Sequence, residues 1–130
     1  MTGLDTNVLV RYIVRDDFAQ AERADAALNE CTAEEPGFVA IVSLAEMVWV
    51  LRSYYRMPKV ALITCIERLF NAENLVMENA QAIRQALDRF AQAKCDFTDC
   101  LIERCGHLAG CRHTVTFDVN AAKTSGMKLL

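Results

Sequence analysis

Short apolar runs alternate along the chain with longer stretches in which apolar side chains recur at helical spacing. The runs of strand length are residues 3–4, 38–42, 75–77, 114–117 and 127–130. The stretches that predict helices are residues 7–14, 18–30, 43–56, 59–70, 79–93, 96–105 and 121–125. Alternation of this kind is typical of parallel strands joined by helical crossovers. We therefore expect an α/β fold in a single domain that spans residues 1–130.

Two acidic residues directly follow expected strands. Asp5 comes after Leu4, and Asp118 comes after the β-branched run that ends at Phe117. The C-terminal ends of parallel strands share one edge of the sheet, and open α/β sheets bind their ligands there. Asp5 has an alternative role, because aspartate is also a favoured N-cap residue for the helix that follows. The repeat of the same arrangement at Asp118 favours a shared site over the cap.

Glu46 is the only charged residue within the apolar residues 44–51. A helix that is apolar on all sides is expected to be buried, and a buried carboxylate has to be paired, protonated or bound to a metal. The structural alternative is an ion pair with Arg11 or Arg52. Glu46 falls in the first helical turn after the second expected strand, which favours the sheet edge where Asp5 lies.

Asp96 and Asp99 open the helix that precedes the fourth strand. Their spacing is that of a capping box, in which Asp96 is the natural N-cap residue. Asp99 begins the apolar run of residues 100–102, and we expect its side chain to point along the edge of the core. Asp99 is therefore a candidate site residue, and Asp96 is a second-tier candidate.

Strand C-termini and helix N-termini lie on the same edge of a parallel sheet, so four acids can converge there. These acids are Asp5, Glu46, Asp99 and Asp118. Carboxylates packed together repel one another, and Mg²⁺ or Mn²⁺ relieves this repulsion because hard cations prefer oxygen ligands. Such an ion can activate water against a phosphodiester. The implied chemistry is metal-dependent hydrolysis of a phosphoryl ester, and nucleic acid is the obvious polymer of such esters.

The composition narrows the class of protein without adding a further site. The 130 residues are 53% hydrophobic, which predicts a folded chain with apolar surface left for an oligomer or a tight partner. The net charge of −3 does not indicate nucleic-acid binding, although a metal can invert the sign of an acidic site. We expect a soluble, cytoplasmic protein whose six cysteines are thiols, since no secretory signal or membrane span is evident.

Four motifs, in order, resemble those of the PIN-domain ribonucleases. They are residues 4–9 (LDTNVL), 43–46 (SLAE), 96–102 (DFTDCLI) and 116–118 (TFD), so the resemblance covers essentially the whole chain. The chain is most similar to the VapC-type toxins of bacterial toxin–antitoxin pairs, whose length it shares. Cys100 stands where the family often has alanine, a departure that leaves the acids intact.

The resemblance implies a three-layer sandwich around a parallel central sheet of about five strands. It also implies a Mg²⁺-dependent endoribonuclease that forms a homodimer and is blocked by a cognate antitoxin. The metal-site acids carried over by residue are Asp5, Glu46, Asp99 and Asp118, with Asp96 as the second-tier candidate. Asp5 and Asp118 would bind the ion most directly. Glu46 and Asp99 would complete the shell and help to position the attacking water.

Three alternatives are weaker. A PIN fold could serve as an interaction module with weak or lost catalysis, although the intact acid set argues against it. A haloacid-dehalogenase-type phosphatase needs an acid two residues after Asp5, where Asn7 stands, and a receiver domain needs a central aspartate that residues 52–59 lack. The pairs Cys105–His107 and Cys111–His113 do not have the spacing of a zinc finger.

RNA would require basic residues at the rim of an acidic site. The candidates are Arg11, Arg15, Arg52, Lys94 and Lys123. The alternative for each of them is a solvent-exposed charged side chain on the surface of a helix. Arg11 and Arg52 have a further alternative as ion-pair partners of the acids.

Overall fold

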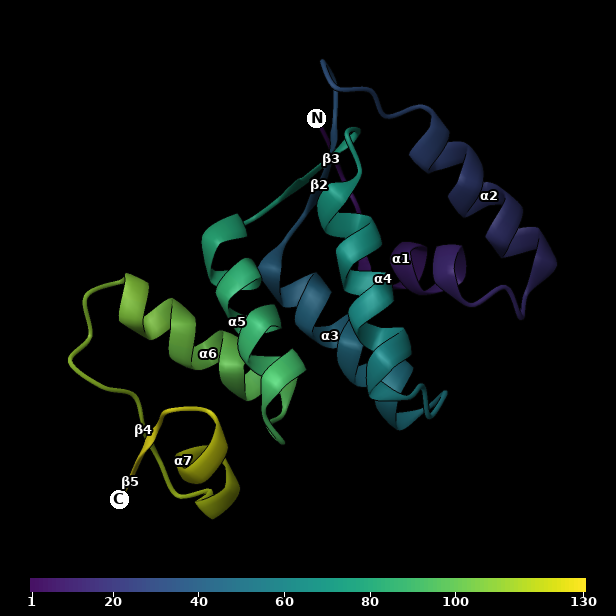
Figure 1. Ribbon diagram of the computed structural model, residues 1–130. Coiled ribbons are helices and arrows are strands. Elements are labelled where there is room, and N and C mark those ends of the chain that lie inside the picture. Colours follow the sequence, from purple (N-terminus) through teal and green to yellow (C-terminus); the bar gives the residue numbers. More distant parts are fainter. The chain divides into compact units, whose positions relative to one another are not determined.

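The computed structural model describes residues 1–130 and contains seven helices and five strands. It divides into two compact units, unit 1 (Met1–Glu78) and unit 2 (Asn79–Leu130). The predicted mixture of parallel strands and helices is confirmed (Figure 1). None of the helices is both long enough and apolar enough to span a membrane.

Unit 1 is built on a three-stranded parallel sheet. Its strands are β1 (Thr2–Gly3), β2 (Gly37–Val39) and β3 (Leu75–Met77), hydrogen-bonded in the order β1-β2-β3. Its helices are α1 (Thr6–Ile13), α2 (Phe18–Asn29), α3 (Ile41–Ser53) and α4 (Lys59–Asn71). The helical crossovers bring all three strands back in the same direction, so β1 and β2 end at the same edge of the sheet.

The core of unit 1 forms where the helices turn their apolar faces inward. α1 packs against α2 and α3, and α4 packs against α3 and β3. Leu9 of α1, Leu44 and Met47 of α3, and Ile66 of α4 are fully buried. Leu9 and Ile66 lie on the apolar faces that the helical spacing of the sequence predicts for α1 and α4.

The start of α3 differs from the prediction. The helix begins at Ile41, two residues before the expected cap at Ser43, so the strand expected at residues 38–42 is shorter. Ala40 occupies the N-cap position and has no side-chain oxygen to accept a hydrogen bond. Glu78 takes over this role, because its Oε2 accepts a hydrogen bond from Ile41 N at 2.8 Å. A carboxylate there also complements the helix dipole.

The expectation that α3 is buried on all sides is wrong. Its inner face is buried through Leu44, Met47, Val48 and Leu51. Val42 and Trp49 on the outer face are 69% and 64% exposed. α3 therefore presents large apolar side chains to solvent, which local hydrophobicity alone does not reveal.

Unit 2 combines a pair of helices with a small second sheet. α5 (Ala80–Gln92) packs against α6 (Phe97–Leu108), and α7 (Val119–Thr124) connects β4 (Val115–Thr116) to β5 (Lys128–Leu129). Phe97 is 1% exposed and meets Phe90 edge-to-face, with 5.7 Å between the ring centroids. This aromatic contact anchors the first turn of α6 on α5.

The central sheet of about five strands that the resemblance implies is not formed as one sheet. All five strands pair in parallel, but three pair in unit 1 and two in unit 2. β4 and β5 contain two residues each, and Lys128 N donates to Thr114 O at 2.8 Å while Leu130 N donates to Thr116 O at 2.9 Å. These hydrogen bonds pair backbone N–H and C=O groups of the β4 and β5 segments with each other within unit 2.

All six cysteines are free thiols. Cys31, Cys95 and Cys100 are buried, where a thiol behaves as a small apolar group. Burial raises the pKa of the Cys100 thiol to about 12, and the neighbouring Cys95 adds to this increase. Cys100 therefore keeps its proton at neutral pH.

Candidate functional site

Asp5 occupies the N-cap position of α1 with a carboxylate that does not cap the helix. Its backbone is extended (φ −74°, ψ 158°), and its carbonyl oxygen accepts hydrogen bonds from Val8 N and Leu9 N at 3.0 and 3.3 Å. The side chain makes no cap hydrogen bond, and the residue is exposed. The alternative role of Asp5 as a side-chain cap is therefore not realised in the structure.

The other aspartates at helix N-caps use their side chains. Asp17, Asp96 and Asp118 each accept a hydrogen bond from the backbone N–H three residues later, at 3.0, 3.2 and 2.9 Å. Such a bond satisfies one of the free N–H groups in the first turn of a helix. Asp5 is the exception among these four, so its carboxylate remains available for a ligand from outside the chain.

Glu46 lies in the second turn of α3 and is exposed, so the expected burial of this carboxylate is wrong. The alternative ion pair with Arg11 is not formed, because Arg11 Nη1 binds Asp16 Oδ1 at 3.0 Å. Asp5 and Glu46 follow β1 and β2, which are adjacent parallel strands. Both acids therefore come after the same edge of the three-stranded sheet.

Unit 2 supplies the remaining candidate acids. Asp96 is the N-cap residue of α6 and Asp99 lies in its first turn, and both are half-buried. The hydrogen bond from Asp99 N to Asp96 Oδ1 confirms the cap expected of Asp96. Asp118 is exposed, follows β4 after Phe117, and caps α7 with one of its two carboxylate oxygens. The predicted sequence of strand and then acid is therefore present at Asp118 as at Asp5.

The candidate acids offer only carboxylate oxygens, which are the donors that Mg²⁺ and Mn²⁺ prefer. Asp5 and Glu46 belong to unit 1, whereas Asp96, Asp99 and Asp118 belong to unit 2. Within either unit, no three His, Cys, Asp or Glu side chains form a group that could hold a metal ion. Asp5 and Glu46 fit such an ion in chemistry, because both are exposed carboxylates that would give up no internal hydrogen bond on binding a cation.

Glu103 is a buried acid outside the predicted set. It is 7% exposed, and its two oxygens accept hydrogen bonds from Arg104 Nε and Nη2 at 2.6 and 2.9 Å. Arg104 Nη1 also donates to Gln85 Oε1 of α5 at 3.3 Å. Glu103 follows Asp99 by one helical turn, a spacing that could have singled it out. Glu103 therefore holds the Arg104 guanidinium group, and Arg104 makes the hydrogen bond that joins α6 to α5.

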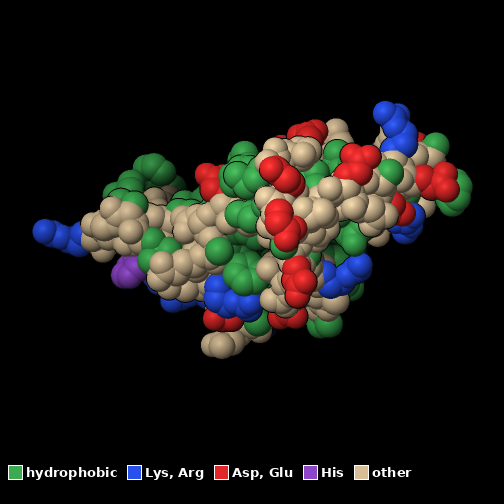
Figure 2. All heavy atoms as spheres, turned by 90° about the horizontal axis from the view of Figure 1, so that it is seen from above, with side chains coloured by type: hydrophobic (Ala, Val, Ile, Leu, Met, Phe, Trp, Pro, Cys, Tyr) green, Lys and Arg blue, Asp and Glu red, His purple; other side chains and the backbone are tan.

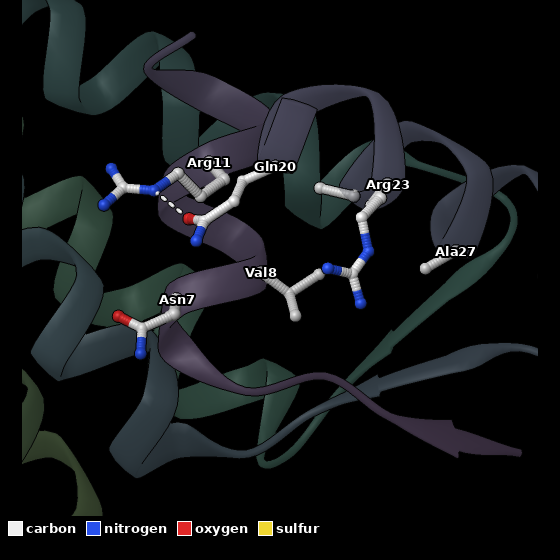
Figure 3. A pocket seen from close by; sticks show the side chains of 7 residues that line it. Asn7, Val8, Arg11, Gln20, Arg23 and Ala27 are labelled. Carbon is white, nitrogen blue, oxygen red and sulfur yellow. Dashed lines mark hydrogen bonds between the residues drawn. The ribbon is translucent and has the colours of Figure 1, made fainter. Parts of the chain in front are cut away.

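A groove of about 350 Å³ lies between α1 and α2 in unit 1. It is lined by Asn7, Val8, Arg11, Gln20, Arg23, Ala24 and Ala27. Figure 3 shows Arg23 reaching from α2 toward α1, with its guanidinium group drawn beside Val8. Asn7 follows Asp5 by two residues, so the groove begins close to a candidate acid along the chain.

Arg23 is the guanidinium in this region that remains without an ion pair. Arg11 binds Asp16 at 3.0 Å, and Arg15 binds both oxygens of Asp25 at 2.8 and 2.6 Å. The bond from Arg15 holds the pKa of Asp25 below its usual range. Arg11 and Arg15, which were predicted to line an RNA-binding rim, are therefore held in ion pairs within unit 1. Arg23 was not among the predicted rim residues.

The face of the molecule drawn in Figure 2 carries no continuous basic surface. Figure 2 shows acidic, basic and hydrophobic side chains interspersed on the face drawn, without a continuous Lys and Arg surface. This pattern agrees with the net charge of −3. A ligand with negative charge would therefore depend on local features, such as Arg23, more than on a broad electrostatic field.

Comparison with protein families gives one match. The model of a family described as "PIN domain" matches residues 4–127. The matched span includes every candidate acid from Asp5 to Asp118 and extends over both units. No curated protein matches the sequence significantly.

Proposed function

The chain belongs to the PIN-domain family, a family of nucleases, and from this premise we propose that it is a Mg²⁺-dependent endoribonuclease. The observation that carries the proposal is the exposed Asp5 carboxylate, which stands at a helix N-cap after a parallel strand and makes no cap bond. A side chain needed only for folding would be expected to satisfy the helix, as those of Asp17, Asp96 and Asp118 do.

We propose that four acids hold the divalent ion, which PIN domains typically bind. They are Asp5, Glu46, Asp99 and Asp118, with Asp96 as a second-tier contributor. Asp5 and Asp118 would hold the ion most directly, and Glu46 and Asp99 would complete the set of ligands and help to position the attacking water. Mg²⁺, or Mn²⁺ in its place, supplies positive charge against the phosphodiester and makes water more acidic when bound. The acids come from both units, and we propose a single nuclease domain over residues 1–130 because one family match extends over both.

Removal of divalent ions provides the direct test. Excess EDTA is expected to lower the cleavage of single-stranded RNA at least about a hundredfold, and added Mg²⁺ is expected to restore it. The measurement is the initial rate on a fluorescent RNA, with an Asp5→Asn preparation purified in the same way to reveal contaminating ribonuclease. Cleavage by the wild-type protein that continues undiminished in EDTA would rule the proposal out.

Arg23 is proposed to contact a phosphate of the RNA in the groove between α1 and α2. Its guanidinium group makes no ion pair and lies among groove-lining residues that begin two positions after Asp5. Arg23→Ala is expected to weaken RNA binding about three- to tenfold with little effect on kcat, because it removes one phosphate contact that does not take part in the bond cleavage. The slope of affinity against salt concentration should decrease by about one ion.

The binding of RNA is best measured in an Asp5→Asn background, where substrate survives. Arg112→Ala is the matched control, since it removes the same charge from an exposed residue that does not line the groove. Equal losses of affinity for Arg23→Ala and Arg112→Ala would contradict a specific contact and indicate a general charge effect.

We also propose that the nuclease is a cytoplasmic, VapC-type toxin that forms a homodimer and is blocked by a cognate antitoxin. The sequence resemblance supports this role, and so do large apolar side chains that unit 1 leaves exposed. They are Val42, Trp49, Tyr54 and Val60, which are 69%, 64%, 76% and 76% exposed. Val42 and Trp49 lie seven residues apart on α3 and therefore share one face of this helix, where neighbouring exposed apolar side chains favour a protein partner. A short reading frame that overlaps the gene upstream would support the toxin pair, and its absence would count against it.

The same exposed side chains favour a second candidate, an interaction module of the PIN fold with weak or lost catalysis. The two candidates differ in cells, because a toxin must cleave RNA to stop growth. An Asp5→Asn variant that still arrests growth fully would support the interaction module. Loss of growth arrest with unchanged protein abundance would support the nuclease.

A further inference from the structure

Two buried cysteines enclose the turn that carries Asp96 and Asp99. Cys95 immediately precedes the N-cap residue Asp96, and Cys100 is the fourth residue of α6. These are the two positions that a hydrophobic staple joins at the start of a helix. Cys95 is 9% exposed and Cys100 is fully buried. The staple at this helix start is therefore made of two thiols.

The two sulfur atoms lie closer than ordinary packing requires. Cys100 Sγ donates a hydrogen bond to Cys95 Sγ across 2.9 Å. A disulfide bond is about 2.05 Å long, so the sulfur atoms need to approach by only about 0.9 Å to become bonded. Cys95 lies directly before the N-cap residue and Cys100 lies in the first turns of α6, so the bond would close a small ring around residues 96–99.

We propose that Cys95 and Cys100 are a redox modification site, which a peroxide converts into an intramolecular disulfide that fixes the N-terminus of α6. Cys95 is the sulfur that attacks, because it accepts the hydrogen bond and is the less buried of the two. Its attack on hydrogen peroxide breaks the O–O bond, gives a sulfenic acid and releases one water. Cys100 then attacks the sulfenic sulfur, the S–S bond forms, and hydroxide leaves as a second water with the thiol proton. Two thiols lose two hydrogen atoms, and the peroxide takes up both.

Cys31 and Cys65 have partners other than a second cysteine. Cys31 Sγ donates to the backbone oxygen of Ala27 at 3.4 Å, and Cys65 Sγ donates to Met57 Sδ at 3.8 Å. Cys111 is exposed. Selectivity for the Cys95–Cys100 pair therefore comes from proximity of the second sulfur, since an oxidised Cys95 meets its partner before it meets another reagent.

The positions of lysine and arginine in the sequence place Cys95 and Cys100 together in one tryptic peptide, so their oxidation can be measured directly. Trypsin cuts after Lys94 and Arg104, so residues 95–104 form one peptide that contains Cys95, Cys100 and no other cysteine. The next peptide, residues 105–112, also contains two cysteines and serves as an internal control. The full-length protein is treated with a few equivalents of hydrogen peroxide, free thiols are alkylated in denaturant, and both peptides are measured by mass spectrometry.

The expected result is a 95–104 peptide that is two hydrogens lighter and carries no alkyl group, while the 105–112 peptide is alkylated twice. Disulfide should accumulate in the first peptide at least about tenfold faster than in the second. Dithiothreitol should return the first peptide to the doubly alkylated form. Full alkylation of residues 95–104 after peroxide treatment, or cross-linking of Cys95 to another chain, would overturn the proposal.

Two variants separate disulfide formation from misfolding. Cys111→Ser removes an exposed thiol and should leave the closure rate unchanged. Cys100→Ala keeps a small apolar side chain in the staple and should abolish the loss of two hydrogens. Hydrogen exchange at Asp99 and Cys100 N–H should slow in the oxidised wild-type protein and not in peroxide-treated Cys100→Ala. Equal exchange in the reduced and oxidised wild-type protein would show that the bond does not fix this turn and would contradict the proposal.

Discussion

Asp5→Asn is expected to lower RNA cleavage at least about a hundredfold while leaving the thermal unfolding midpoint unchanged. The amide keeps the shape of the side chain but removes the negative charge that a divalent ion requires. The stability of the fold should not change, because the Asp5 carboxylate is exposed and makes no cap bond with α1. The measurements are the cleavage rate at saturating Mg²⁺ and a thermal melt of the same preparation.

Asp17→Asn is the matched control for this variant. Asp17 is also an N-cap aspartate in unit 1, but its Oδ1 accepts a hydrogen bond from Gln20 N at 3.0 Å. Asparagine caps about as well as aspartate, so both activity and stability should remain close to wild type. A large loss of stability in Asp5→Asn, or equal losses of activity in the two variants, would show that Asp5 serves the fold and not the reaction.

Phe97→Ala is expected to destabilise unit 2 by about 3–5 kcal/mol, the range measured when a buried phenylalanine is truncated to alanine. Phe97 is 1% exposed at the first position of α6 and stacks edge-to-face on Phe90 of α5. Its removal leaves a cavity under the turn that holds Asp96 and Asp99. Because a domain is stable by only about 5–15 kcal/mol, this loss should be visible as an earlier urea transition.

Phe117→Ala provides the control for side-chain size. Phe117 lies between β4 and α7 and is 83% exposed, so its truncation should change the free energy of unfolding by less than about 0.5 kcal/mol. Urea unfolding followed by circular dichroism compares the two variants directly. Similar transitions for Phe97→Ala and Phe117→Ala would contradict the position of Phe97 in the core.

Local sequence determined the secondary structure well where a helix or its cap depends on neighbouring residues. α1, α2, α4 and α5 begin and end within about two residues of the stretches with helical spacing. Asp96 caps α6 as the capping-box spacing predicts. These features follow from side chains within one helical turn, so they can be recognised without knowledge of the fold.

Long-range contacts decided which of the charged groups are engaged. Arg11 Nη1 donates to Tyr55 Oη, 44 residues away, at 2.9 Å, whereas Arg23 forms no ion pair and lines the groove between α1 and α2. The start of α3 depends on Glu78, which is 37 residues from the N–H that it caps. No local pattern can predict such pairings, because they arise only when the crossovers return the chain to the same place.

The sequence by itself determined that Asp5 follows a strand and precedes a helix, and it left two roles open. Both a helix cap and a ligand fit an aspartate at that position. Only the tertiary structure decided that the carboxylate makes no cap bond and is exposed. Likewise, Cys95 and Cys100 are five residues apart in the sequence, but the turn around Asp96 brings their sulfur atoms to 2.9 Å. The identity of a residue defines what it can bond, whereas the folded backbone defines which partner it reaches.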